Sequence, residues 1–258
     1  KLLASPAEMT DYLDKHDIQS ILFDCDGVLY RTPDPAPGAA ACLQALLQAG
    51  RRLFFVTNNS AANPAQLRNK LTHILGLDKD DDDDTVLLLT QDMMISTAFT
   101  AAQYLKQQLL DDTRSTTTKT HSNDRPRVYV IGSDGLRDEI RRTGFDIALG
   151  GEESSEKLSM NRDELATYDF DALGAVDAVV VGHDTDFGFR KLCIANVLLQ
   201  RNPQALLVAT NLDAFDLVGG DSRHLPGNGS LVNALEYSSG RPAVDCGKPS
   251  RLLAGLLD

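Results

Sequence analysis

The segment at residues 21–30, ILFDCDGVLY, is the one that decides the expected fold. Its first three residues belong to an apolar run at residues 18–23, and this run predicts a buried strand. Asp24 and Asp26 follow with one residue between them. Because side chains alternate along an extended chain, both carboxylates would lie on one side at the carboxyl end of the strand, where open parallel sheets bind ligands. Gly27 has no Cβ and therefore allows a sharp turn directly afterwards.

Two carboxylates this close repel each other unless a proton or a cation lies between them, and oxygen ligands favour Mg²⁺. The alternative is an Asp-rich turn after a core strand, because Asp-x-Asp is a common pattern. Two further motifs in the same order favour the metal site: TNNS at residues 57–60, after the apolar run at 53–56, and GKPS at residues 247–250.

The three motifs together resemble those of the haloacid-dehalogenase superfamily of phosphatases. The most similar branch holds the p-nitrophenyl phosphatases and phosphoglycolate phosphatases, together with the pyridoxal-phosphate phosphatases. This resemblance implies an α/β fold with a Rossmann-like parallel sheet core and an inserted α/β cap domain. We expect the core at residues 1–123 and 223–258 and the cap at residues 124–222.

The periodicity of the chain predicts alternating strands and helices, which is typical of a parallel sheet covered by helices. After the two motif strands, further strands are expected at residues 128–132, 176–181 and 205–210. Residues 31–37, with three prolines, predict an extended loop. The expected helices are 5–15, 38–49, 64–75, 95–110, 133–143, 189–200 and 230–239.

The resemblance assigns the catalytic work to the first motif. Asp24 would attack phosphorus and form an aspartyl-phosphate. Asp26 would protonate the leaving alkoxide and then deprotonate the water that hydrolyses the intermediate. Mg²⁺ would be bound by Asp24 and by the backbone carbonyl of Asp26.

The other two motifs would bind the phosphoryl group. Thr57 would hydrogen-bond a phosphoryl oxygen, beside the backbone N–H groups of Asn58 and Asn59. Lys248 would neutralise phosphoryl charge and keep the nucleophile ionised. A solvated surface lysine is the alternative, which the Gly-Lys-Pro setting disfavours.

Relatives carry a fourth motif, Gly-Asp-Arg-x-x-Thr-Asp, that supplies the remaining acidic Mg²⁺ ligands. It does not occur in this sequence, whose last residue is Asp258. We expect the sequence to be a fragment; a natural truncation with impaired metal binding is the alternative.

Two functions follow as hypotheses. The first is an Mg²⁺-dependent phosphatase of small-molecule phosphomonoesters, with 2-phosphoglycolate as the leading substrate. The second is a catalytically defective relative that binds phosphate ligands or a protein partner. A haloacid dehalogenase is disfavoured because it attacks carbon and needs no second aspartate at position 26, and a P-type pump would need membrane spans.

Composition limits the partners and the compartment. A net charge of −12 argues against nucleic acid or an anionic membrane surface as a partner. No run reaches the length of a membrane span, and the four cysteines show no CxxC spacing, so a reducing, cytoplasmic setting is expected. The expected partner is a small phosphorylated metabolite, and the resemblance also allows a homodimer through the cap.

Several weaker features remain open or favour a structural interpretation. The aspartates of residues 78–84 predict a solvated loop rather than a cation site, and residues 111–123 predict a flexible insertion. His183 and Asp184 could form a catalytic pair, but a structural turn at a strand end is favoured.

The substrate loop of the cap gives one weak indication. Pyridoxal-phosphate phosphatases have a substrate-contacting His where this chain has Asp216, which disfavours pyridoxal phosphate. Arg223 and His224 could bind a substrate carboxylate or be ordinary loop residues, and the two interpretations are evenly balanced. Cys25 is expected to pack into the sheet, with a redox switch as the alternative.

Overall fold

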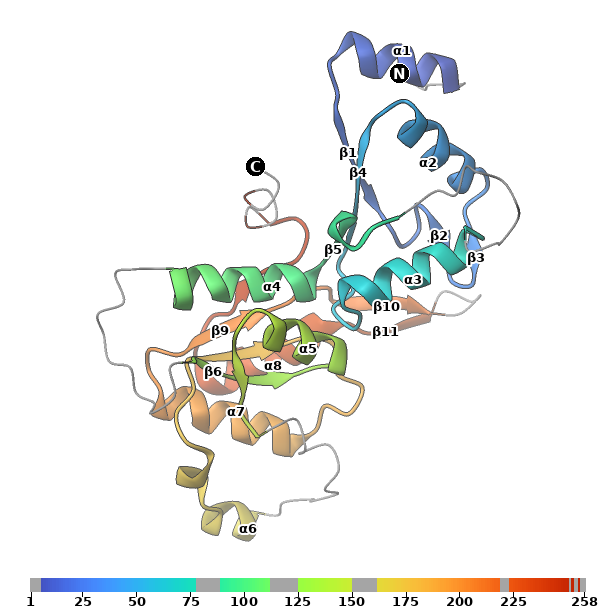
Figure 1. The fold of residues 1–258 in the computed structure, drawn as a ribbon. Coiled ribbons are helices and arrows are strands. Elements are labelled where there is room, and N and C mark those ends of the chain that lie inside the picture. The colour runs from blue at the N-terminus through green and yellow to red at the C-terminus, as the bar shows by residue number, and fades with distance from the viewer. Residues whose placement is uncertain are drawn as a thin grey trace. The chain divides into compact units, whose positions relative to one another are not determined.

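The computed structural model describes residues 6–77, 89–111, 125–149, 162–218, 223–250, 252 and 255 (Figure 1). The chain divides into two compact units. Unit 1 comprises residues 1–57 and 64–96, and unit 2 comprises residues 58–63 and 97–258. The Asp-rich loop expected at 78–84, and residues 112–123 of the expected insertion, lie outside the described residues.

Unit 1 is built on a three-stranded parallel sheet in the order β1-β4-β5. The strands are β1 (Ser20–Asp24), β4 (Arg52–Thr57) and β5 (Met94–Ser96). The predicted strands at 18–23 and 53–56 are therefore confirmed within two residues at each end. Strand β4 is nearly continuous in apolar residues, as is usual for a parallel strand that is covered on both faces.

Helices and one small hairpin complete unit 1. Helix α2 (Ala39–Gln48) lies between Gly38 and Gly50, both at positive φ (77° and 73°), where an L side chain would be strained. The segment expected to be an extended loop forms the two-residue strands β2 (Tyr30–Arg31) and β3 (Asp34–Pro35), paired antiparallel. The remaining helices are α1 (Pro6–Lys15), α3 (Pro64–Ile74) and a 3₁₀ turn at Gln91–Met93.

Unit 2 is built on a five-stranded sheet in the order β12-β9-β8-β6-β7, and all its pairs are parallel. Three of these strands confirm the predictions at 128–132, 176–181 and 205–210. The strands are β6 (Arg127–Ile131), β7 (Asp146–Ile147), β8 (Ala178–Val181), β9 (Leu206–Ala209) and β12 (Val244–Asp245).

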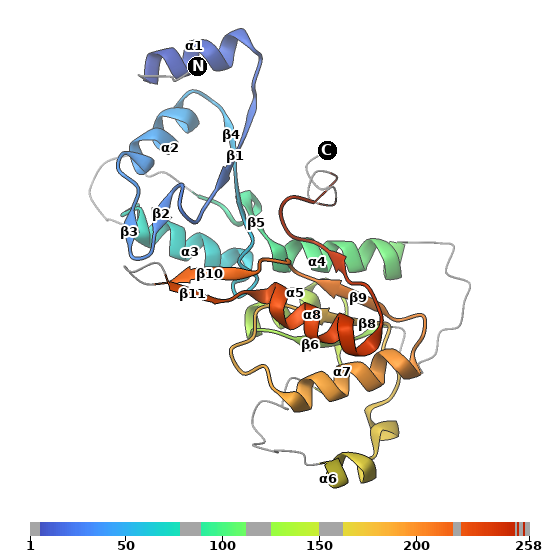
Figure 2. The same cartoon turned by 180° about the vertical axis from the view of Figure 1, so that it is seen from behind.

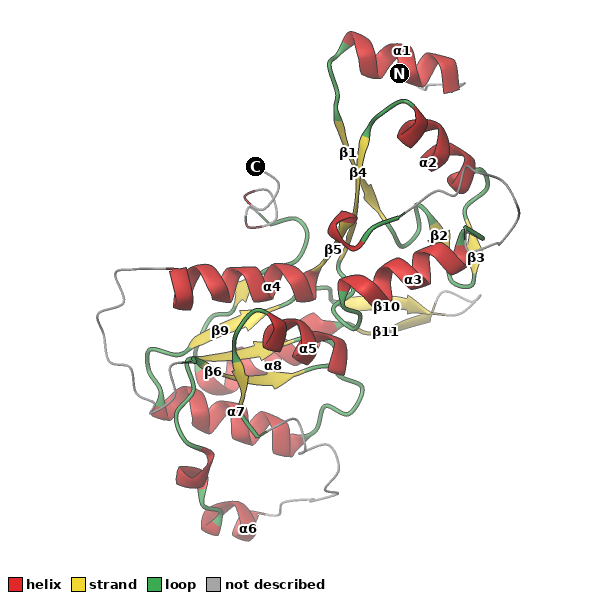
Figure 3. Cartoon of the chain, viewed as in Figure 1, coloured by secondary structure: helices red, strands yellow, loops and turns green. Residues whose placement is uncertain are grey.

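Helices cover both faces of this sheet, as Figures 2 and 3 show. Side chains alternate along a strand, so neighbouring residues of β8 enter different cores. Val179 and Val181 pack with α7 (Phe189–Arg201) and α8 (Asn228–Ser239), whereas Ala178 and Val180 pack with α4 (Thr97–Lys106) and α5 (Asp134–Arg142). Unit 2 is thus a three-layer α/β/α arrangement.

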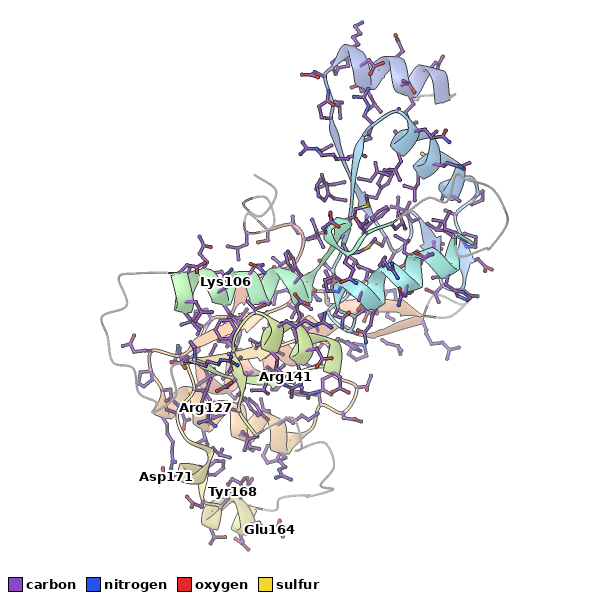
Figure 4. All side chains as sticks on the ribbon, in the orientation of Figure 1. Lys106, Arg127, Arg141, Glu164, Tyr168 and Asp171 are labelled. Atoms are coloured by element: carbon purple, nitrogen blue, oxygen red, sulfur yellow. The ribbon has the colours of Figure 1, made fainter. Side chains whose placement is uncertain are left out.

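Unit 2 also contains shorter elements outside its five-stranded sheet. Arg127, which is labelled in Figure 4, holds the chain at residues 173–175. Its guanidinium donates to the carbonyls of Leu173 (3.2 Å) and Ala175 (3.0 Å). The short elements are a π-helical turn at Gln107–Asp111, α6 (Arg162–Thr167), a 3₁₀ turn at Phe170–Leu173, and the antiparallel hairpin of β10 (Phe215–Val218) and β11 (Arg223–Pro226).

The helix predicted at residues 95–110 is wrong at its start. Residues 94–96 form β5, and the helix begins at Thr97. The cause is tertiary: Ile95 pairs with Val56 of β4, and backbone pairing of a buried strand outweighs local helix propensity. Helix α8 likewise begins at Asn228, two residues before the predicted start.

The boundaries of the two units differ from the core and cap boundaries expected at 123/124 and 222/223. Residues 223–250 belong to the same unit as 125–218, because β12 pairs with β9 and α8 packs on α7. The division into core and cap therefore stays a prediction about the complete protein. No helix among the described residues is long and apolar enough to cross a membrane.

Candidate active site

Strands β1 and β4 of unit 1 bring the first two motifs to one edge of the sheet. They run parallel with Asp24 opposite Val56, so their carboxyl ends lie side by side. Asp24 is the last residue of β1 and Thr57 the last of β4. The Asp24 side chain is exposed, whereas Thr57 is buried at 1% exposure.

A tight turn holds Asp26 at the same edge. Gly27 adopts φ 84° and donates its N–H to the carbonyl of Tyr30 (2.8 Å), while the Cys25 carbonyl accepts from Leu29 N–H (3.0 Å). Asp24 and Asp26 are exposed and Cys25 between them is fully buried at 0%. This pattern confirms the prediction that Cys25 packs inward, and it is the pattern expected if the two carboxylates share a side.

Two hydrogen bonds orient these carboxylates. The Thr57 hydroxyl donates to Asp26 Oδ2 (3.2 Å), and the backbone N–H of Cys25 donates to Asp24 Oδ1 (2.9 Å). The phenol of Tyr30 is buried nearby; its burial first, and the charge of Asp26 second, raise the pKa of Tyr30 far above its ordinary value. Tyr30 is therefore a neutral wall of the turn and not a base.

The oxygen donors of Asp24 and Asp26 are of the type that Mg²⁺ prefers, and both carboxylates are open to solvent at the strand ends. They fit a divalent cation in chemistry and in position. Within the described part of the chain, no three His, Cys, Asp or Glu side chains are grouped so that they could hold a metal ion. Among the described residues, these two carboxylates alone do not make a complete ligand set for a metal ion.

Asn58, the first residue of unit 2, is the centre of a second polar group. Its side-chain Nδ2 donates to both carboxylate oxygens of Asp213 (3.1 and 3.0 Å), and its Oδ1 accepts from the backbone N–H of Lys248 (2.8 Å). Its carbonyl accepts from Thr97 Oγ1 and from Asn211 Nδ2, both at 2.8 Å. Asn58 therefore joins the second motif to the third.

Lys248 follows β12 in a turn that is fixed by Asp245. The Gly247 N–H donates to Asp245 Oδ1 (2.8 Å). Burial raises the pKa of Asp245, the bond from Gly247 lowers it, and the charge of Asp213 raises it further, with a net upward shift. The side chain of Lys248 is half-buried.

Asn59 uses its side chain locally, since its Oδ1 accepts from the N–H of Ala61 (2.8 Å) and closes a turn. The structure thus groups the six predicted site residues in two sets. Asp24, Asp26 and Thr57 lie in unit 1, and Asn58, Asn59 and Lys248 lie in unit 2. Thr57 and Asn58 are consecutive, so one peptide bond links the two sets.

His183 and Asp184, the possible catalytic pair, contact different residues. Asp184 accepts from Lys191 Nζ (2.7 Å), and both side chains are buried, at 6% and 8% exposure. His183 faces another residue, with Nδ1 3.9 Å from Asp216 Oδ2. The predicted structural turn is therefore confirmed, and a catalytic pair of His183 with Asp184 is wrong.

Arg223 and His224 lie on β11 and are both exposed. The His224 ring stacks on Phe215, with ring centroids 4.0 Å apart and planes 2° from parallel. Sequence reasoning missed the contact of Asp213 with Asn58, which are 155 residues apart in the chain. Neither local sequence carries a signal for this contact.

Comparison with known proteins agrees with this geometry. A family model described as haloacid dehalogenase-like hydrolase matches residues 21–146. The chain is 37% identical to chronophin from Bos taurus over 234 residues, which cover 90% of this chain and 66% of that protein. It is 30% identical to phosphoglycolate phosphatase 1A, chloroplastic, from Arabidopsis thaliana over 240 residues, which cover 93% and 59% respectively.

A third relative is 4-nitrophenylphosphatase from Schizosaccharomyces pombe, 30% identical over 252 residues that cover 96% of this chain and 74% of that protein. The chain spans less than two thirds of the length of chronophin and of the phosphoglycolate phosphatase. The same family is indicated by the parallel α/β fold, by the three motifs and by these relatives. The chain belongs to the haloacid dehalogenase-like hydrolases.

Proposed function

We propose that the intact protein is an Mg²⁺-dependent phosphatase of small phosphomonoesters that works through an aspartyl-phosphate. The observation that carries the proposal is the edge formed by β1 and β4. There, two exposed carboxylates separated by one residue lie beside the Thr57 hydroxyl, which is 3.2 Å from Asp26. Two paired strands and the turn after β1 thereby offer a nucleophile, an acid–base group and a hydrogen-bond donor for the phosphoryl group.

In the first step, an oxygen of Asp24 attacks phosphorus and the ester P–O bond breaks. Asp26 donates its proton to the departing alkoxide. In the second step, Asp26 removes a proton from water, the water oxygen attacks phosphorus, and the P–O bond to Asp24 breaks. Asp24 returns as a carboxylate and inorganic phosphate leaves.

The second and third motifs would bind the phosphoryl group during both steps. The Thr57 hydroxyl can rotate from Asp26 to a phosphoryl oxygen, since a hydroxyl hydrogen is free to turn. The backbone N–H groups of Asn58 and Asn59 follow it in the chain, and Lys248 would supply the positive charge. Mg²⁺ bound at Asp24 and at the carbonyl of Asp26 would neutralise further phosphoryl charge.

The substrate we propose is a small phosphorylated acid, with 2-phosphoglycolate first. Two observations support this choice: one relative is a phosphoglycolate phosphatase, and Arg223 and His224 are exposed on β11, where they could bind a carboxylate. The stacking of His224 on Phe215 leaves the ring edge available for a hydrogen bond.

The test is turnover of 4-nitrophenyl phosphate and of 2-phosphoglycolate by the protein at its full natural length, with and without Mg²⁺. We expect Mg²⁺-dependent release of phosphate from both esters and its loss in Asp24→Asn. Asp34→Asn, which changes an exposed carboxylate on β3, is the matched control and should retain activity. Phosphate release that is equal without Mg²⁺, or equal in Asp24→Asn, would exclude this mechanism.

A further inference from the structure

Asn58 can donate and accept through its side-chain amide, and its surroundings fix which atom does which. Both carboxylate oxygens of Asp213 lie within 3.1 Å of Asn58 Nδ2. An ionised carboxylate only accepts hydrogen bonds, so the amide must present its NH₂ group to Asp213. Its oxygen then faces the backbone N–H of Lys248, at 2.8 Å. The charge on Asp213 thus determines how the loop of Lys248 is held.

The carboxylate is itself supported by its backbone. The Asp213 N–H donates to Asn211 Oδ1 (3.1 Å), and its carbonyl accepts from Gly229 N–H (2.9 Å). A Cβ added at Gly227 would lie 2.3 Å from that same carbonyl oxygen. The first turn of α8 therefore packs directly against the loop, which leaves Asp213 little freedom to move.

A buried amide fastens the loop to the sheet. Asn228 is 2% exposed, and its Nδ2 donates to the carbonyls of Asn211 (2.8 Å) and Val181 (3.1 Å). The end of β8 and the start of the Asp213 loop are consequently held at one point. Asp213 is thus connected by hydrogen bonds both to the sheet of unit 2 and to Lys248.

We propose that Asp213 is a positioning residue for the phosphatase reaction, acting on Lys248 through the side chain of Asn58. The inference rests on the proposed function, because it gives Lys248 its task at the phosphoryl group. Asp213 need not touch the substrate. It orients one amide, and that amide fixes the backbone that carries the lysine.

The polarity of the contact can be exchanged, which gives a sharp test. Asn58→Asp places a second carboxylate against Asp213, and the two repel. The double variant Asn58→Asp/Asp213→Asn restores the hydrogen bond between the two side chains with donor and acceptor exchanged. The new amide at position 213 then donates to the new carboxylate at position 58, whose second oxygen still accepts from Lys248 N–H.

The experiment is a double-mutant cycle on kcat and KM with 4-nitrophenyl phosphate, in the intact protein. We expect Asn58→Asp to lower kcat/KM by about tenfold or more, and the double variant to recover most of that loss. Asp186→Asn, another exposed carboxylate of unit 2, is the control and should leave both constants unchanged. A double variant that is as poor as Asn58→Asp would overturn the proposal, because the reversed pair would then fail to restore the effect of the contact on Lys248.

A spectroscopic measurement separates failure of this inference from failure of the proposed function. The amide ¹H–¹⁵N resonance of Lys248 should shift in Asn58→Asp and return towards its original position in the double variant, whether or not the protein turns over an ester. If Asn58→Asp does not fold, Asp213→Ala replaces it, because loss of the acceptor lets the Asn58 amide rotate and should shift the same resonance. An unchanged Lys248 resonance in the folded variant would contradict the proposal.

Discussion

At the residue scale, Asp26 accepts a hydrogen bond from the Thr57 hydroxyl (3.2 Å) and lies in the turn closed by Gly27. A group that gives a proton in one step and takes one in the next must not be fixed by a permanent ion pair. A rotatable hydroxyl orients the carboxylate without holding its charge state. This environment suits general acid–base work.

We therefore expect Asp26→Asn to slow hydrolysis of an alkyl phosphate by roughly a hundredfold or more, with phosphate binding retained. The loss should be smaller for formation of the intermediate from 4-nitrophenyl phosphate, whose phenolate leaves without a proton. The burst of 4-nitrophenol before steady state, the steady-state rate with the alkyl ester, and inhibition by inorganic phosphate measure these effects. An unchanged alkyl-ester rate in Asp26→Asn would remove the residue from its role.

Cys25 lies between two residues of the site but is 0% exposed. Because an oxidant must reach the sulfur, peroxide should not inactivate the native protein through this residue. Activity after peroxide treatment, in the wild type and in Cys25→Ala, checks this expectation. Reversible inactivation that the alanine variant escapes would show that Cys25 is a redox switch.

Within helix α8, a glycine without a Cβ lets the first turn pack closely against the Asp213 loop. A Cβ at Gly229 would lie 2.5 Å from the carbonyl oxygen of Leu212, which cannot move without shifting backbone. Alanine gains up to about 1 kcal/mol over glycine inside a helix, but overpacking costs about 1–3 kcal/mol. The clash outweighs the gain.

We accordingly expect Gly229→Ala to lower the free energy of unfolding by about 1–2 kcal/mol. Gly188→Ser is the matched control, because its added Cβ meets no atom closer than 3.9 Å and serine is favoured at the start of a helix. Its free energy of unfolding should change by less than about 0.5 kcal/mol. Equal unfolding midpoints in denaturant for Gly229→Ala and wild type would contradict the packing described for α8.

Elements with strong local patterns could be predicted from the sequence, and those made by tertiary pairing could not. The apolar run of β4 and the glycines around α2 are local signals, and both elements occur where expected. Strand β5 has only three residues and owes its form to pairing with β4, so its local sequence predicts helix instead.

The same distinction applies to the candidate site. Alternation along β1 was enough to predict the exposed carboxylates and the buried Cys25. The contact of Asn58 with Asp213 joins residues 155 positions apart, and nothing in either local sequence indicates it. His183 and Asp184 show the converse, because adjacent residues paired with different partners, Asp216 and Lys191.

Stability against pH is a property of the whole molecule to which buried carboxyl groups contribute. Burial raises the pKa of Glu139, while Arg142 lowers it, with a net upward shift. A folded-state pKa above the unfolded value means that the folded chain holds the proton more tightly. This contribution stabilises the fold fully below the unfolded pKa, about 4.3 for Glu, and is lost as the pH rises through the folded pKa.

Glu139→Gln removes that ionisation, so it should raise the unfolding temperature relative to wild type at about pH 7 and leave little difference at about pH 4. Asp138→Asn, at a neighbouring and more exposed carboxyl group that pairs with Arg141 (3.2 Å), is the comparison and should not raise the unfolding temperature at neutral pH. Thermal unfolding across this pH range measures both. A Glu139→Gln variant that is destabilised most at neutral pH would show that the charged form of Glu139 supports the fold.

The phosphoryl-enzyme intermediate tests the central claim most directly. The intact protein would be mixed with 4-nitrophenyl phosphate and Mg²⁺, quenched in acid within one turnover, and digested for mass spectrometry. We expect one added phosphoryl group on the peptide containing residues 21–30, located at Asp24, removed by hydroxylamine and missing in Asp24→Asn. Turnover by the wild type with the phosphoryl group on another residue, or comparable turnover by Asp24→Asn, would contradict the mechanism.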